Sequence, residues 1–197
     1  MTIERIASDK PADFGSWIQT VSGLKFDALA PEPGMISILD IAHALSKLCR
    51  YNGHVREFYS VAQHSSLGSL VLRDEGFDED VQFQFLLHDA SEYVLADVPR
   101  PFKKYLGNYY EIEAGIQAVI MKKFGLPQEL VPEVITMDNR MLRTEAEQLF
   151  DFEPLEDWHL ACGEPVPIEI YPLTPAEAQH QFLSVFQELT GVGVVAS

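Results

Sequence analysis

The sequence predicts an all-α protein with a small β-hairpin near its N-terminus. From about residue 37 onward, apolar residues recur at three- and four-residue intervals, which is the period of a helix with one buried face. Before that point the periodicity is absent, and two short apolar runs flank a Ser-Gly turn, which is typical of a hairpin. The 197 residues can bury a sizeable core without cross-links, so we expect a single domain over 1–197.

Breakers and caps delimit the elements. We expect the hairpin within 15–28, and Tyr51-Asn52-Gly53 interrupts the first helix. Gly125 is a typical residue to close a helix, whereas Thr174 followed by a proline is typical of a helix start. Proline-rich residues 151–174 are expected to form a loop before a final helix, so that loop and helix cover 151–190. Five to seven helices are expected in all, starting near residues 37, 60, 78, 108, 131 and 174, with the third running to residue 95.

Composition and charge exclude several classes of function. Fourteen Lys and Arg against 30 Asp and Glu give a formal charge of −16, which argues against binding a nucleic-acid polymer or an anionic membrane. A phosphorylated ligand would need a few placed basic residues or a metal ion. Cys49 and Cys162 form no disulfide framework, and neither a secretory leader nor a membrane-spanning run is visible, so we expect a cytoplasmic protein.

Ionisable residues interrupt apolar stretches at three places in the chain. His88-Asp89 falls inside the helix expected over 78–95, where burial is costly unless the pair is hydrogen-bonded or bound to metal. Glu92 should share the helix face of His88, four residues away. His64 lies near a helix start and Asp138 inside a long helix; alone, each could be a surface residue. Together, two imidazoles and two carboxylates suit a divalent ion such as Mn²⁺, Co²⁺, Fe²⁺ or Mg²⁺.

Several segments share a resemblance to one known family. The order His64, His88-Asp89, Asp138 resembles the HD superfamily of metal-dependent phosphohydrolases. The similarity covers about 36–150 and is closest to small bacterial and phage proteins related to 5′-deoxynucleotidases. An HD-domain helical bundle is therefore the expected fold. The segments that carry this closer similarity are 40–45, 50–54, 59–65, 88–92 and 97–103.

The resemblance implies a metal site and an acidic pair beside it. Glu92 and Asp97 match the residues that position or deprotonate the attacking water. One divalent ion is implied, either Mn²⁺, Co²⁺, Fe²⁺, Zn²⁺ or Mg²⁺, without a choice among them. The implied metal ligands are His64, His88, Asp89 and Asp138. Structural roles remain as alternatives: Glu92 as a salt-bridge partner and Asp97 as a turn residue.

The resemblance also implies residues that bind the substrate. Arg50 matches a phosphate-binding arginine, although it could simply cap the preceding helix. Lys103 is a second candidate phosphate clamp or a solvated charge. Tyr51 stands where deoxynucleotidases carry a tryptophan beside the sugar 2′ position, so the preference for deoxyribose is open. The sequence assigns no role to His43 or His54.

The expected activity is metal-dependent hydrolysis of a small phosphorylated nucleoside, in the first place as a 5′-(deoxy)nucleotidase. A dNTP triphosphohydrolase is the main alternative, and a guanosine tetraphosphate hydrolase fits less well because the companion domains of that family are not visible. A non-catalytic, nucleotide-binding HD scaffold is the alternative of another class. The related nucleotidases also imply a homodimer.

Overall fold

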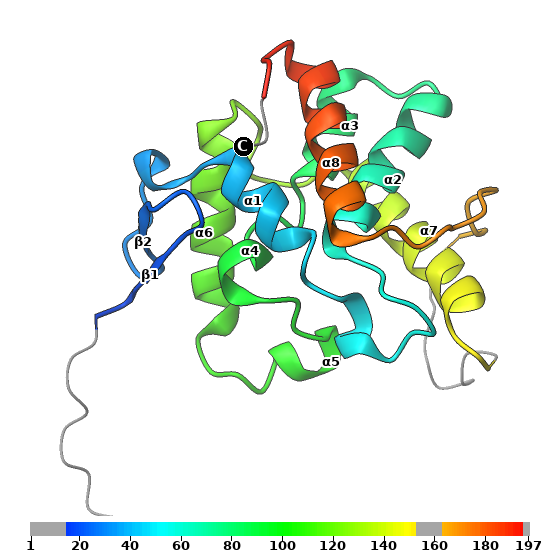
Figure 1. The fold of residues 1–197 in the computed structure, drawn as a ribbon, viewed down its shortest axis with the longest axis horizontal. Coiled ribbons are helices and arrows are strands. Elements are labelled where there is room, and N and C mark those ends of the chain that lie inside the picture. Colours follow the sequence, from blue (N-terminus) through cyan, green and yellow to red (C-terminus); the bar gives the residue numbers. More distant parts are fainter. Residues whose placement is uncertain (1–14, 153–162, 195–197) are drawn as a thin grey trace, which may run out of the picture.

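The computed structural model describes residues 15–152 and 163–194 of the chain. This described part is mostly helical, with eight α-helices and one two-stranded antiparallel sheet (Figure 1). The all-α prediction with a small hairpin is therefore confirmed. The helices are α1 (Ile38–Leu45), α2 (Val61–Asp74), α3 (Glu79–Leu86), α4 (Glu92–Leu95), α5 (Arg100–Lys103), α6 (Tyr109–Lys123), α7 (Pro132–Leu149) and α8 (Pro175–Thr190).

The hairpin lies inside the predicted range 15–28. Strand β1 (Trp17–Gln19) pairs with β2 (Lys25–Asp27), and a longer turn than Ser-Gly alone joins them. In that turn, Ser22 donates from its backbone N–H and its hydroxyl to the buried carboxylate of Asp40, at 2.9 and 2.7 Å. These two bonds attach the hairpin to α1.

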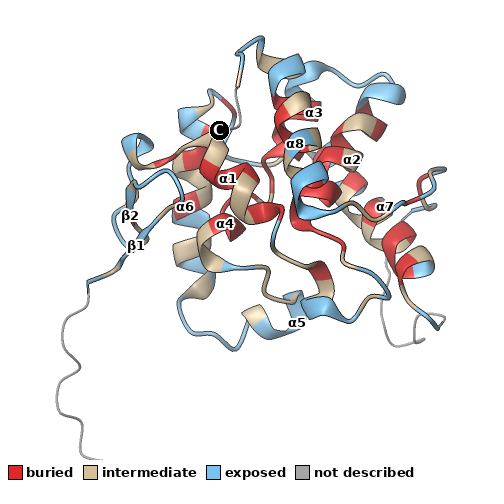
Figure 2. Ribbon diagram, viewed as in Figure 1, coloured by how far each residue is buried: buried red, intermediate tan, exposed pale blue. Residues whose placement is uncertain are grey.

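The helices surround one main core and two smaller ones, both of which include residues of α7. Helix α2 is central, since it contacts α3, α7 and α8 (Figure 1). At its middle, Gly68 lies directly against the ring of Phe85 on α3. The buried faces of α1, α2, α3 and α8 meet in the interior, whereas α5 lies at the exposed lower edge of the view in Figure 2. No helix within the described ranges is long and apolar enough to cross a membrane.

The single helix predicted over 78–95 is wrong. Helix α3 ends at Leu86, the chain turns through 87–91, and α4 begins at Glu92. The Gln117 side chain stabilises this break, since it donates to Leu87 O at 2.7 Å and accepts from Ser91 N at 3.0 Å. Backbone groups that lose helical partners thus find a side chain instead. This break, together with the short α5, raises the number of helices in the described part of the chain above the predicted range.

The described part of the predicted loop, 163–174, has neither helix nor strand. Two glutamine side chains, one from α2 and one from α7, hold it in place. Gln148 and Gln63 each use both ends of their amide, binding Ile168–Ile170 and Tyr171–Leu173 respectively. The helix start at Thr174 is confirmed, because its hydroxyl accepts from Glu177 N while the Glu177 side chain accepts from Thr174 N.

Candidate metal centre

Four predicted ligands from three elements converge in the interior. His64 lies in the first turn of α2. The hydroxyl of Ser60 caps the N-terminus of this helix by accepting from Gln63 N. His88 and Asp89 lie on the turn that breaks α3 from α4, and Asp138 lies on α7. Because His88 and Asp89 lie on this turn and not inside a helix, both of their side chains can point toward the same place.

The distances between the ligand atoms are short enough for one ion. His64 Nε2 lies 3.4 Å from Asp138 Oδ1 and 3.4 Å from His88 Nε2. His88 Nε2 lies 3.8 Å from Asp138 Oδ1. The group His64, His88 and Asp138 therefore could hold a metal ion. Asp89 Oδ2 adjoins the same point, 3.2 Å from His88 Nε2 and 3.8 Å from His64 Nε2.

The other ring nitrogen of each histidine has its own acceptor. His88 Nδ1 lies 2.6 Å from the backbone oxygen of Phe85, and His64 Nδ1 lies 2.6 Å from Glu145 Oε1. Since carbonyl and carboxylate oxygens only accept, both Nδ1 atoms carry the hydrogen. A neutral ring then presents the Nε2 lone pair to the cluster, as in metal-binding histidines.

The cluster is electrostatically suited to a cation. Burial disfavours charge on both imidazoles, but the neighbouring carboxylates outweigh it. They raise the pKa of His88 well above its ordinary value, and they raise the pKa of His64 by a smaller amount. Burial would raise the pKa of Asp138, but hydrogen bonds from the two imidazoles hold it well below its usual range. Positive charge between these groups is therefore favourable, and a divalent ion can supply it in place of two protons.

Sequence reasoning missed Glu145, the carboxylate that organises one side of the cluster. It is fully buried and accepts hydrogen bonds from His64, from Arg50 Nε at 3.1 Å, and from the hydroxyls of Tyr51 and Tyr59 at 2.6 and 2.9 Å. Burial would raise its pKa, but Arg50, His64 and Tyr51 lower it to about 2. The available signal was an acid two helical turns after Asp138, on the apolar face of α7.

Arg50 and Tyr51 adjoin the cluster, but their polar groups bind carboxylates. Arg50 is buried and also lies 3.4 Å from Asp89 Oδ2 through its NH1. The predicted helix break places Tyr51 in the left-handed region, at φ 56°, and its hydroxyl reaches Glu145. His43 bonds Lys47 and His54 is exposed, so neither belongs to the cluster.

Glu92 and Asp97 lie next to the cluster, although Glu92 is not on a helix shared with His88. Glu92 is buried, and its Oε2 has no hydrogen-bond partner among the described residues. Burial, reinforced by Asp89 and Asp97, raises the pKa of Glu92 well above its ordinary value. Burial also raises the pKa of Asp97. Lys103 Nζ lies 3.8 Å from Glu92 and donates to Glu113 at 2.6 Å, so it is already paired with acids.

A second basic residue at the cluster was not assigned from the sequence. Arg100 on α5 donates from NH2 to Asp138 Oδ2 at 3.1 Å. It lies within the segment 97–103 that carries part of the family resemblance, and its position between two prolines was the available signal.

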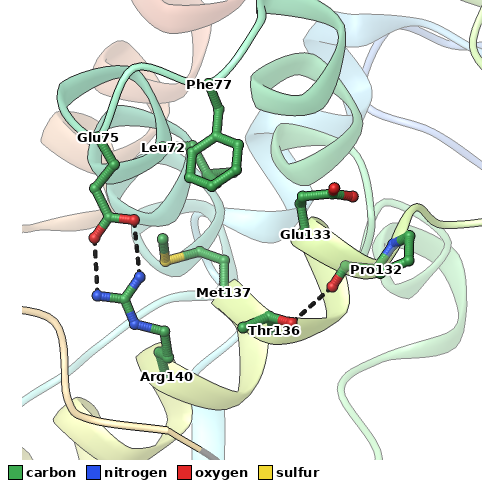
Figure 3. Close-up of a pocket in the computed structure, with 8 residues that line it drawn as sticks. All are labelled: Leu72, Glu75, Phe77, Pro132, Glu133, Thr136, Met137 and Arg140. Carbon is green, nitrogen blue, oxygen red and sulfur yellow. Dashed lines mark hydrogen bonds and ion pairs between the residues drawn. The ribbon is translucent and has the colours of Figure 1, made fainter.

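A pocket elsewhere shares no lining residue with this cluster. It measures about 210 Å³ and lies between the end of α2, the following turn and the first half of α7 (Figure 3). Figure 3 shows Phe77, Leu72 and Met137 as its apolar part, while Arg140 binds both oxygens of Glu75 at 2.8 Å on one side. Its chemistry indicates no catalytic group.

The structure thus defines a mostly helical protein with a buried group of histidines and carboxylates that could hold a metal ion. The chain is 37% identical over 180 residues to the uncharacterized protein YfdR of Escherichia coli K12, covering 89% of this chain and 96% of that protein. It is also 37% identical over 162 residues to an uncharacterized protein of Rhodobacter capsulatus, covering 78% of this chain and 82% of the relative. The chain belongs to the YfdR family. No protein-family model matches the sequence.

Proposed function

We propose that this protein is a metal-dependent phosphohydrolase of the HD superfamily. The supporting observation is the convergence of His64, His88 and Asp138 around one point, with Asp89 beside them. The mixed nitrogen and oxygen donor set and the fixed Nδ1 hydrogens fit a divalent ion such as Mn²⁺. A purely structural ion-pair cluster would not require, next to it, a buried carboxylate with one unbonded oxygen such as Glu92 Oε2.

The chemistry follows from the charges at this site. A bound divalent ion polarises a phosphoryl oxygen and lowers the pKa of water. Glu92 is the proton acceptor in this proposal, since burial and the nearby carboxylates raise its pKa well above its ordinary value and Oε2 has no partner within the described part of the chain. Arg50 binds the carboxylates of both Asp89 and Glu145 and holds them in place.

The substrate we propose is a small phosphorylated nucleoside, with a 5′-(deoxy)nucleoside monophosphate first. The family resemblance of 36–150 supports this choice. The charge of −16 supports a small ligand that a metal ion can attract and disfavours a polymer.

A turnover assay tests this proposal. The purified protein is stripped of metal, supplied with Mn²⁺, Co²⁺ or Mg²⁺, and assayed on NMPs, dNMPs, dNTPs and guanosine tetraphosphate. We expect metal-dependent phosphate release from monophosphates, loss of it in Asp89→Ala, and normal turnover in Asp74→Ala, which alters an exposed acid at the end of α2. Triphosphate release would indicate the triphosphohydrolase instead. Absence of turnover on the whole panel, or full activity in Asp89→Ala, would refute the proposal.

A further inference from the structure

Arg100 differs from the other basic residues at the cluster, Arg50 and Lys103, in being exposed. Its side chain is 67% exposed, yet it contacts a candidate metal ligand, Asp138 Oδ2. It belongs to α5, where Pro99 and Pro101 restrict the backbone on both sides. The guanidinium therefore reaches the cluster from the solvent side and starts from a stiff segment.

The two less exposed basic residues, Arg50 and Lys103, already bind carboxylates. The Arg50 side chain is 10% exposed and is bound by Glu145 and Asp89. The Lys103 side chain is 15% exposed and is bound by Glu113 and Glu92. Removing either from its carboxylates would leave buried charges unpaired, which is costly. The ion pair of Arg100 with Asp138 is open to solvent on its arginine side, so Arg100 can exchange this partner more readily than Arg50 or Lys103 can exchange theirs.

The two oxygens of Asp138 face different partners. Oδ1 faces the imidazoles of His64 and His88, at 3.4 and 3.8 Å, and Oδ2 faces Arg100. The guanidinium thus adjoins the candidate ion site through a single carboxylate. A phosphate held at that site would have oxygens directed outward, and a planar guanidinium can bind two of them at once.

We propose that Arg100 is a substrate-binding residue, whose guanidinium leaves Asp138 Oδ2 to bind the outward oxygens of a phosphomonoester. This inference rests on the proposed function for the class of ligand. It assigns the accessible phosphate contact to α5, whereas Arg50 positions carboxylates inside the cluster.

The test measures the binding of inorganic phosphate and of Mn²⁺ separately, by calorimetry. In Mn²⁺-loaded Arg100→Gln, we expect the Kd for phosphate to rise about 10–100-fold, because a charge-assisted contact is lost. The Kd for Mn²⁺ should stay within about threefold of wild type, because the Arg100–Asp138 contact is open to solvent on its arginine side and contributes little to holding the ligand in place. Arg100→Lys should restore part of the phosphate affinity. Arg143→Gln, which alters a partly exposed arginine of α7 paired with Glu147, should change neither constant.

The outcomes separate this inference from the proposed function. Weaker Mn²⁺ binding with unchanged phosphate affinity in Arg100→Gln would mean that the arginine only holds Asp138, and would overturn the inference. Absence of phosphate binding to the wild type would overturn it as well. If the wild type hydrolyses no phosphate ester but binds phosphate through Arg100, the proposed function fails and the inference stands. If phosphate esters are hydrolysed and Arg100→Gln raises neither KM nor the Kd for phosphate, only the inference fails.

Discussion

Two neighbouring regions are held in place by different interactions. One is the buried cluster around His64, and the other is the exposed segment beside it, residues 96–106, which we call the mouth segment. In the cluster, both imidazoles have partners on each ring nitrogen, and the carboxylate of Glu145 accepts four hydrogen bonds. In the mouth segment, Phe102 and Tyr105 are 60% and 75% exposed. The cluster is therefore fixed by mutual hydrogen bonding, whereas the mouth is fixed mainly by its backbone.

The mouth segment begins at a strained residue. Ala96 has φ 68° and ψ 160°, a region that residues other than glycine rarely adopt. This conformation ends α4 and turns the chain toward Asp97 and Arg100. The cluster should therefore depend on its buried hydrogen bonds and the mouth segment on its backbone conformation, which the following variants test.

Glu145→Gln should have the largest effect, because it disrupts the cluster from behind. We expect it to reduce stability by about 3 kcal/mol, since Arg50 loses a buried partner. Loss of this support for His64 should weaken Mn²⁺ binding by about 10–100-fold. Tyr59→Phe removes only one neutral donor to Glu145 and should cost about 1–2 kcal/mol. Urea unfolding and Mn²⁺ titration measure both. Wild-type Mn²⁺ affinity in Glu145→Gln would contradict this account of the cluster.

The contribution of Glu145 should also depend on pH. Its pKa is lowered from 4.5 to about 2, so the folded state favours the carboxylate over the acid. The corresponding stability, about 3 kcal/mol, is fully present above pH 4.5 and is lost as the pH falls toward 2. The stability difference between wild type and Glu145→Gln should therefore be constant from neutral pH to about 4.5 and shrink below it. A difference that does not change with acidification would show that Glu145 is not held ionised.

Gly68→Ala tests the packing beneath the cluster and should have an intermediate effect. A methyl group there would overlap the buried ring of Phe85, whose centroid lies 4.5 Å from that of His88. We expect destabilisation of about 1–3 kcal/mol from overpacking. Gly115→Ala, at an open helical position on α6, should instead stabilise by about 1 kcal/mol. Thermal unfolding of the two variants should thus shift in opposite directions, and an unchanged midpoint in Gly68→Ala would contradict the close contact.

Ala96→Gly should have the smallest effect and the unusual sign. Relief of the strained conformation should exceed the entropy that glycine adds to the unfolded chain, for a net stabilisation of about 1 kcal/mol. Ala114→Gly, at an exposed position inside α6, should destabilise by about the same amount. Chemical unfolding distinguishes the two. Destabilisation by Ala96→Gly would mean that the backbone at the mouth is not strained.

Much of this fold could be predicted from local patterns. The hairpin, the break at Tyr51 and the capped start at Thr174 depend on turn and cap chemistry that is visible in the sequence. The break between α3 and α4 could not be predicted, because it depends on Gln117, a side chain from another helix. Apolar periodicity continues through the break, so the pattern alone favours one long helix.

The candidate site shows the same division. The family resemblance implied a common site for four residues, and the structure places them close together: His64, His88, Asp89 and Asp138. The supporting groups did not follow from the resemblance, since Glu145 and Arg100 act through contacts with the cluster from distant parts of the chain. Such partners are defined by three-dimensional packing, and a single sequence marks them only as charged residues in unusual positions.

The most direct test of the central claim is a titration of the metal-stripped protein with Mn²⁺, followed by calorimetry. One ion per chain should bind to the wild type, with protons released from the histidines on binding. Asp138→Asn should lose this binding, while Glu133→Gln, which alters an exposed acid in the first turn of the same helix, should keep it. Absence of saturable binding to the folded wild type, or wild-type affinity in Asp138→Asn, would contradict the metal centre.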